Sequence, residues 1–275
     1  SEVIKMLIYE IDPLQPYFVL NTQIYYKINP VNSPIAHFYQ FTCTEDNPIV
    51  NGVVPDGATD FIFDISNGEA VVSGSVESVI RTPFKRGNTY FGVRLKPGTT
   101  EHYGDISVSE LLGKSVPLAD VTKMSRFEQA FDCKSFENRA NIVNNIVLDM
   151  IGDSEKKDTP ELVNEILLNI YDRKGDISVN ELEKTLFYSR RHLLRMFRQY
   201  TGMDIKSFCR ITRFQSVLSQ LSHGKYSGFS DVAQQYGYYD QTHFQKEFKE
   251  YSLLTPKIYV NTLDNIKYQN RIKHF

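Results

Sequence analysis

The chain has 275 residues, 41% of them hydrophobic, which suffices for one large core or two smaller ones, and its length favours two domains. No apolar run approaches the roughly 20 residues that a membrane-spanning helix needs, and residues 1–10 lack the layout of a signal peptide, so we expect a soluble, cytoplasmic protein without membrane association. The net charge of −2 is polarised, with 10 Lys plus Arg against 15 Asp plus Glu in residues 1–130 and 14 against 12 in residues 158–261.

The three cysteines are Cys43, Cys133 and Cys209, and no short spacing pairs them. This pattern argues against a disulfide framework and against a zinc site. We expect three buried free thiols, and we predict neither a metal site nor a cofactor.

Residues 1–130 predict a β domain. Short β-type runs occur here, bounded by turn residues such as Asn67-Gly68 and Lys96-Pro97-Gly98. The runs are residues 17–20, 24–26, 38–41, 61–65, 71–72 and 90–95. They indicate an antiparallel sandwich or barrel-like domain, which we interpret as a sensor or dimerisation domain.

Residues 131–157 predict a helix followed by a linker. Apolar residues recur at helical spacing from Phe136 to Ile151, and residues 152–158 are polar and charged. Thr159-Pro160-Glu161 then has the composition of a helix start. By position and amphipathicity, the helix is where we expect coupling or dimer contact.

An internal repeat with equivalent positions 51 residues apart lies in the C-terminal half, where residues 188–200 match residues 239–251. On a helix, Leu193 and Phe197 fall on one stripe, as do Phe244 and Phe248. The opposite side carries the cations of each copy. Each copy therefore predicts a helix that buries aromatic side chains and presents long cations.

Each repeated helix follows a shorter amphipathic helix and a turn, and begins at a capping residue, Ser189 or Asp240. This is the helix-turn-helix arrangement, in which the second helix enters the major groove of DNA. Residues 205–221 predict a long helix that connects the two units. We thus expect an α+β chain with an all-α DNA-binding domain over residues 158–261 and a tail over residues 262–275.

The alternative for either repeated helix is an ordinary solvated surface helix. Two copies at fixed spacing, each with its own cap and turn, argue against it. So do the seven basic residues and one acidic residue between Arg190 and Arg213. The sequence therefore favours a binding surface for double-stranded DNA.

These residues resemble the AraC/XylS family of bacterial transcription regulators. The signature of the first unit stands as Ser189, Arg191, Leu193, Arg195 and Phe197, followed by Gly202. In the second unit the matching residues are Asp231-Val232-Ala233, Gly237-Tyr238, Asp240-Gln241-Thr242-His243-Phe244, Phe248-Lys249 and Thr255-Pro256. The resemblance implies a sequence-specific DNA-binding transcription regulator, with RNA polymerase as a partner.

The resemblance is incomplete. Phe187 stands where the first turn of the family has glycine, Glu183 replaces a small residue, and Leu253 replaces the glycine before Thr255-Pro256. We therefore expect the first unit to pack or dock less ideally than the second. Residues 55–63 and 91–98 resemble the sensor half of one branch of the family, which implies a barrel-like effector or dimerisation domain.

We assign DNA-contacting roles from the outer faces of the repeated helices. Guanidinium and other polar side chains there reach base edges, and those nearer the helix ends reach phosphate. For base reading we predict Arg191, Arg195, Thr242, Gln245 and Lys246. For phosphate contact and positioning we predict Ser189, Arg190, Arg198, Gln241 and Lys249. The two helices would enter adjacent major-groove segments.

Other residues leave two interpretations open. Arg210 and Arg213 in the connecting helix suit either DNA contact or an internal ion pair, for example with Asp231. His192 and His243 suit either packing or phosphate contact. Aromatic residues in the N-terminal part could line an effector pocket, with Tyr25, Tyr26, Tyr39 and Phe41 as its candidates beside Tyr17 and Phe18, or form an ordinary β core.

Three functions are consistent with this sequence. The first is a regulator whose N-terminal domain binds a small-molecule effector or mediates homodimer contact. The second is a regulator without a ligand, whose N-terminal domain serves protein contacts alone. The third is a DNA-repair protein that accepts alkyl groups, which needs an activated thiolate. None of the three cysteines sits among basic or histidine neighbours in a way that suggests an activated thiolate, and no catalytic constellation stands out, so we expect no enzyme.

Overall fold

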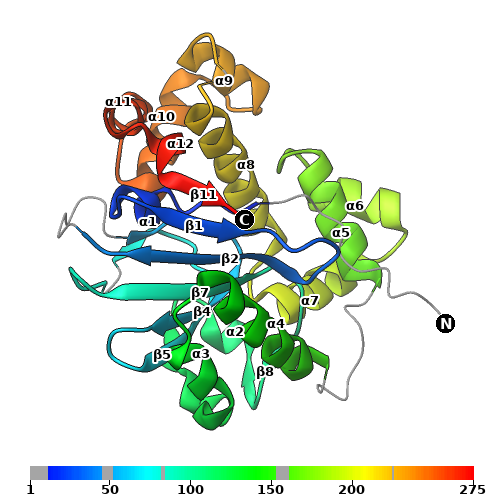
Figure 1. Cartoon of the computed structure of the whole chain (residues 1–275). Helices are drawn as coiled ribbons and strands as arrows, with labels where there is room; N and C mark the ends of the chain where they lie inside the picture. The colour runs from blue at the N-terminus through cyan, green and yellow to red at the C-terminus, as the bar shows by residue number, and fades with distance from the viewer. Residues whose placement is uncertain (1–11, 45–51, 82–83, 153–160, 225) are drawn as a thin grey trace.

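The computed structural model describes residues 12–44, 52–81, 84–152, 161–224 and 226–275. A mixed sheet lies at its centre (Figure 1), and neighbouring strands are antiparallel except for the parallel pair β1 and β11. In spatial order the strands are β10 (Ser115–Pro117), β5 (Glu69–Ser73), β4 (Thr59–Asp64), β7 (Thr89–Leu95), β2 (Ile35–Thr42), β1 (Tyr25–Ile28) and β11 (Ile272–His274). The predicted order of a β-rich part followed by a helical part is confirmed.

The predicted run at residues 17–20 is a helix and not a strand. Pro16 occupies the first position of α1 (Pro16–Leu20), where its missing N–H costs nothing, and all five side chains are buried. The other predicted runs coincide with β1, β2, β4, β5 and β7. Both faces of β4 and β7 are buried, which explains their nearly continuous apolar sequences.

Short elements and one long helix cover one face of the sheet. Phe61, Phe63 and Phe91 of the sheet pack there with Val143 and Val147 of α4, the helix predicted from Phe136. Figure 1 shows α2, α3 and α4 together on this side. The elements are α2 (Val108–Leu111), the 3-10 turns Leu118–Asp120 and Met124–Phe127, α3 (Glu128–Asp132), α4 (Phe136–Gly152) and the small pair β8 (His102–Tyr103) and β9 (Ile106–Ser107). The other small pair, β3 (Gly52–Val53) and β6 (Ile80–Arg81), packs in a different core.

The C-terminal half is helical. Its helices are α5 (Glu161–Asp172), α6 (Val179–Leu186), α7 (Arg190–Thr201), α8 (Ile205–Ser222), α9 (Phe229–Gln235), α10 (Gln241–Ser252), α11 (Pro256–Ile266) and α12 (Tyr268–Arg271). The predicted connecting helix is α8, and both repeated helices are present as α7 and α10. The linker expected after residue 152 and the start at Thr159-Pro160 lie outside the described residues. Across the described ranges, no helix is long and apolar enough to span a membrane.

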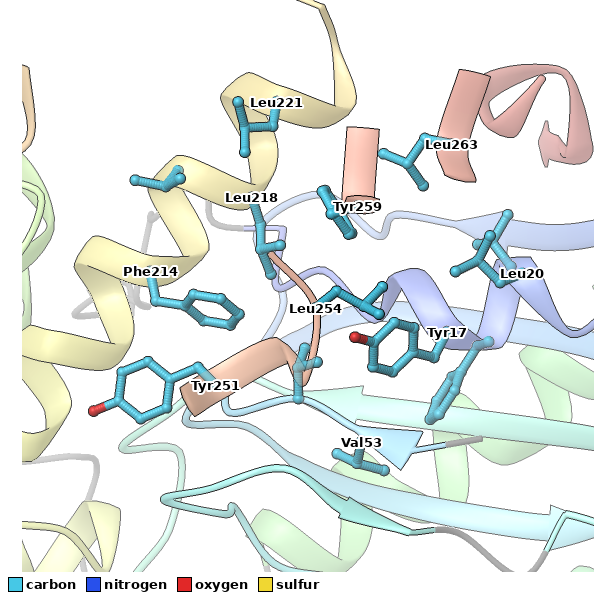
Figure 2. Close-up of a cluster of buried hydrophobic side chains, with 14 of the residues drawn as sticks. Tyr17, Leu20, Val53, Phe214, Leu218, Leu221, Tyr251, Leu254, Tyr259 and Leu263 are labelled. Atoms are coloured by element: carbon cyan, nitrogen blue, oxygen red, sulfur yellow. The ribbon is translucent and has the colours of Figure 1, made fainter. Parts of the chain in front are cut away.

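The first helix-turn-helix unit has its own core, whereas the second unit shares one with the sheet. Leu182, Leu193, Phe197 and Phe208 belong to the first core. In the shared core, Figure 2 shows side chains from α1, β3, α8, α10 and α11 converging, and the Tyr17 hydroxyl donates to the carbonyl of Ser252. The labelled residues are Tyr17, Leu20, Val53, Phe214, Leu218, Leu221, Tyr251, Leu254, Tyr259 and Leu263. The second unit is therefore packed onto the sheet.

The segment expected as a tail contributes to both halves. Residues 262–266 finish α11, and β11 pairs with β1 in the register Tyr25 to Ile272. The Arg271 guanidinium donates to the carbonyls of Leu20, at 3.2 Å, and Thr22, at 2.6 Å. This pairing ties the last helices to the sheet edge. The domain boundaries 1–130, 131–157, 158–261 and 262–275 stay a prediction.

Candidate DNA interface

The first unit consists of α6, a turn and α7. A capping box starts α6, in which Ser178 and Glu181 bond each other's backbone N–H. The C-cap of the helix is Phe187, which has a left-handed φ of 59° and is 91% exposed. The residue that departs from the family's glycine thus adopts the backbone conformation that glycine favours.

Ser189 occupies the N-cap position of α7, as predicted, but its side chain makes no capping bond. The backbone N–H of Arg190 instead donates to Oε1 of Glu183 at 2.6 Å. A carboxylate beside a helix N-terminus is stabilising, because exposed N–H groups and the helix dipole favour negative charge. Glu183, noted in the sequence only as a departure, therefore helps to start the recognition helix.

The second unit is α9, a turn and α10. Asp240 is the N-cap of α10 and accepts the N–H of His243 at 2.7 Å. The turn contains Gly237, with a φ of 66°, and the C-cap of α10 is Leu253, with a φ of 60°. Leu253 too stands in place of a family glycine. In the second unit the N-cap side chain itself, Asp240, caps the helix, whereas in the first unit Glu183 of the preceding helix does so.

The two recognition helices, α7 and α10, have matching faces. Leu193, Phe197, Phe244 and Phe248 are fully buried, as the repeat predicted. All ten residues assigned to DNA lie on α7, α10 or the N-cap of α7. Gln245 is half-buried, and the other nine are exposed: Ser189, Arg190, Arg191, Arg195, Arg198, Gln241, Thr242, Lys246 and Lys249. These side chains lie where a ligand can reach them.

Few of these cations are engaged inside the chain. The Arg190 side chain lies 3.4 Å from Oδ1 of Asn180, and Nη2 of Arg195 lies 3.2 Å from Nδ1 of His192. In the described part of the chain, Arg191, Arg198 and Lys246 form no ion pair with an acidic side chain. Their charge remains available to an anionic partner.

The two repeated histidines contact aromatic residues of their own turns. His192 stacks on Tyr188 with ring centroids 5.4 Å apart, and His243 meets Tyr238 edge-on at 5.5 Å. Packing is therefore present in both copies. It leaves the phosphate-contact interpretation a prediction.

Arg210 and Arg213 form internal contacts, but Asp231 is not their partner. Arg210 reaches Glu247 at 3.0 Å and Glu250 at 3.5 Å, both on α10. Asp231 instead accepts the hydroxyl of Ser227 at 2.6 Å. Sequence reasoning chose the wrong acid because the bend between α9 and α10 determines which carboxylate faces α8.

The four candidates for an effector pocket do not lie together. Tyr25, Tyr39 and Phe41 are buried and mutually stacked in the shared core, with centroids 5.9 to 6.3 Å apart. Tyr26 is on the opposite sheet face, against Phe136, so grouping it with the others was wrong. Successive strand residues point to opposite faces, which is the physical reason.

The space beside Tyr39 is filled by charged side chains. Arg94 is fully buried, donates to both carboxylate oxygens of Asp60 at 2.9 and 2.5 Å, and lies 3.2 Å from Asp56. Its guanidinium carbon is 5.6 Å from the Tyr39 ring centroid. The two carboxylates and the aromatic rings around Arg94 compensate the cost of burying its charge. This region is therefore a structural core.

One exposed aromatic at the interface received no role from the sequence. Tyr239, directly before the cap of α10, is 92% exposed, while its repeat counterpart Tyr188 is 45% exposed and stacked on His192. The repeat places a tyrosine before the cap in both copies, but it does not predict which of the two rings is exposed to solvent. Exposure distinguishes them.

Each half of the chain is similar to a known domain family. The model of a helix-turn-helix domain matches residues 182–262, and a domain of unknown function (DUF6597) matches residues 29–117. An uncharacterized HTH-type transcriptional regulator of Haemophilus influenzae is 31% identical over 86 residues, and the Msm operon regulatory protein of Streptococcus mutans is 26% identical over 114 residues. The first match covers 31% of this chain and 28% of the relative, and the second covers 41% of each. The chain thus matches less than half the length of either relative.

Solved structures with similarity include ToxT from Vibrio cholerae and the C-terminal domain of AraT from Geobacillus stearothermophilus. ToxT is 12% identical, with a TM-score of 0.46, over 82% of this chain and 97% of its own. The AraT domain is 21% identical, with a TM-score of 0.35, over 39% of this chain and 88% of its own. The helix-turn-helix match and the two regulator relatives support the predicted resemblance to the AraC/XylS family of transcription regulators.

Proposed function

We propose that both recognition helices read DNA, so that one chain recognises two adjacent major-groove segments of a promoter. The repeat carries this proposal, because α7 and α10 each bury an apolar stripe that contains aromatic residues and expose a row of polar and cationic ones. A helix entering the major groove contacts base edges with residues near its N-terminus. Two such helices in one chain suit an asymmetric site.

Base reading is assigned to Arg191 and Arg195 on α7, and to Thr242, Gln245 and Lys246 on α10. Arginine pairs with the O6 and N7 acceptors of guanine, whereas threonine and glutamine suit other base patterns. Phosphate contact is assigned to Ser189, Arg190, Arg198, Gln241 and Lys249. These contacts add affinity and salt dependence with little sequence preference.

The first unit contributes more of the affinity, because its recognition helix carries arginine at both base-reading positions. We expect Arg195→Ala to weaken specific binding more than Lys246→Ala, by about 1–3 kcal/mol for loss of a bidentate base contact. Titration of the full chain on a duplex enriched from a randomised library measures both. Arg173→Ala, an exposed arginine that pairs with Glu181, is the control. The reverse order of Arg195 and Lys246 contradicts this division.

The N-terminal part controls the two units through protein contact or an effector. The packed aromatic rings and buried Arg94 favour protein contact over an effector site at Tyr25, Tyr39 and Phe41. Homodimer formation and contact with RNA polymerase in the cytoplasm belong to this proposal. Stabilisation of the full chain by a member of a metabolite library, in a thermal-shift screen, would favour an effector instead.

The repair alternative has no chemical support at the cysteines. Burial raises the pKa of the Cys209 thiol to about 12, which disfavours the reactive thiolate. Cys43 is fully buried, and the Cys133 thiol donates to the carbonyl of Ser135 at 3.4 Å. A regulator without chemistry of its own remains the proposal, and methyl transfer from alkylated DNA to any of the three would contradict it.

A further inference from the structure

Arg213 lies where the connecting helix α8 passes from one core to the other. Phe208 and Ile211 belong to the core of the first unit, and Phe214 and Leu218 belong to the core shared with the second unit. Because one continuous helix serves both cores, its middle turn determines how the two units are rotated relative to each other. Arg213 is in this turn.

The Arg213 side chain bridges the two units. Nη2 lies 3.8 Å from Oδ1 of Asp176 and donates to the carbonyl of Gly175 at 3.4 Å, both in the loop between α5 and α6, the first helix of the first unit. The guanidinium carbon also lies 5.3 Å from the ring centroid of Tyr238, in the turn of the second unit. The Arg213 side chain is only 16% exposed, whereas the Asp176 side chain is 72% exposed.

The same loop touches the second turn directly. Nζ of Lys174 lies 5.3 Å from the Tyr236 ring centroid. A Cβ on Gly237 would stand 3.2 Å from the Asp176 carboxylate, and one on Gly175 would stand 2.0 Å from the carbonyl oxygen of Cys209. Both glycines have left-handed φ values, 66° and 79°, and both permit a close backbone approach. The junction of the two units is therefore a packed contact.

We propose that this junction, formed by Arg213, the loop at Lys174–Asp176 and the turn at Tyr236–Tyr238, fixes the helical phase between α7 and α10. It thereby restricts the spacing of the two DNA half-sites that the chain accepts. This inference rests on the proposed function, since spacing has meaning only if both helices contact DNA. Arg213 is a positioning residue, which acts on specificity without contacting a base.

The test compares affinities for duplexes that differ only in half-site spacing. The half-sites are taken from a randomised library enriched on the wild-type full chain, then rebuilt with centre separations around one helical turn, about 10 base pairs. The readout is the ratio of affinities between the best spacing and one about two base pairs away. Affinity for a single half-site and the melting temperature are recorded for each variant.

We expect Arg213→Gln to lower this ratio by about threefold or more, in line with couplings within a contact network, while single half-site affinity is unchanged. Asp176→Asn lowers it in the same direction by less, because that side chain is 72% exposed. Arg213→Lys, which keeps the charge, partly restores the ratio. Arg173→Gln removes an equal charge from the same loop, where Arg173 pairs with Glu181 of α6, and leaves the ratio unchanged.

Each other outcome overturns the inference. A wild-type ratio in a folded Arg213→Gln chain contradicts the junction, and if that variant does not fold, an unchanged ratio in Asp176→Asn does so. If the wild type protects two groove segments yet shows no spacing preference, the junction is wrong and the proposed function stands. If it protects one segment at every spacing, both fail.

Discussion

At the scale of single residues, the two halves of the chain treat charge differently. Buried charged side chains in the sheet are paired, whereas the arginines on the recognition helices are exposed. Arg94 is paired with Asp60 inside the sheet, whereas Arg191 and Arg198 are exposed. The sequence predicts the exposed arginines, because their positions follow from helical periodicity. It does not predict the Arg94 pair, which depends on two strands lying side by side in register.

His37 is the residue whose protonation should most affect folding at mildly acidic pH. Burial, together with the charge of Lys27, lowers its pKa from 6.5 to about 3, although Asp12 opposes the shift. The folded state therefore keeps His37 neutral where the unfolded chain binds a proton. The stability that this contributes is present above the unfolded pKa and decreases as the pH falls toward the folded value.

We expect wild-type unfolding free energy to fall by about 2 kcal/mol more than that of His37→Gln between about pH 7 and about pH 5. Urea denaturation of both chains at the two pH values measures this difference. Glutamine removes the titrating group and keeps a polar side chain. Equal losses in the two chains would show that His37 is protonated in the folded state.

At the scale of elements, the helix-turn-helix units were predictable because their signals are local. Caps, apolar periodicity and the repeat lie within a few turns of each other. The helix α1 was mistaken for a strand, since Tyr17 to Leu20 is a short apolar run whose conformation is set by Pro16 and by packing on α10 and α11. The spatial groupings at Tyr26 and Arg210 failed because they depend on strand pleat and on the bend between helices.

The turn of the first unit should be strained at Phe187. This residue has a φ of 59°, and it is 91% exposed, so its ring gains little from packing. A left-handed conformation costs a non-glycine residue roughly 1–2 kcal/mol. Substitution by glycine removes this cost, but the greater entropy of glycine in the unfolded chain offsets part of the gain. We expect Phe187→Gly to raise the free energy of unfolding by about 0.5–1 kcal/mol in urea denaturation.

Phe187→Ala is the matched control for that measurement, because it removes the ring and keeps the Cβ atom responsible for the strain. Its stability should stay close to that of the wild type. If alanine stabilises the chain as much as glycine does, the ring and not the backbone is the source of the effect.

At the scale of the whole molecule, the second unit is bound to the sheet more extensively than the first. It shares a core with α1 and β3, and the segment beyond α11 continues into β11, which pairs with β1 (Figure 1). The first unit touches the N-terminal half at the end of α7, where the Ser109 hydroxyl donates to the carbonyl of Arg198 at 3.2 Å. Both recognition helices thus contact the N-terminal half.

The pairing of β11 with β1 could not be predicted from the sequence. The two strands are separated by most of the chain, and Ile272–His274 is too short to show strand periodicity. The same applies to the junction at Arg213, where the Lys174–Asp176 loop and the Tyr236–Tyr238 turn meet. Long-range packing determines both, and no local pattern encodes it.

The central claim is that both recognition helices contact DNA in one complex. Hydroxyl-radical footprinting of the full chain on its enriched duplex tests it most directly. We predict two protected major-groove segments per bound chain, with centres about 34 Å or one helical turn apart. Protection of a single groove segment would contradict the account.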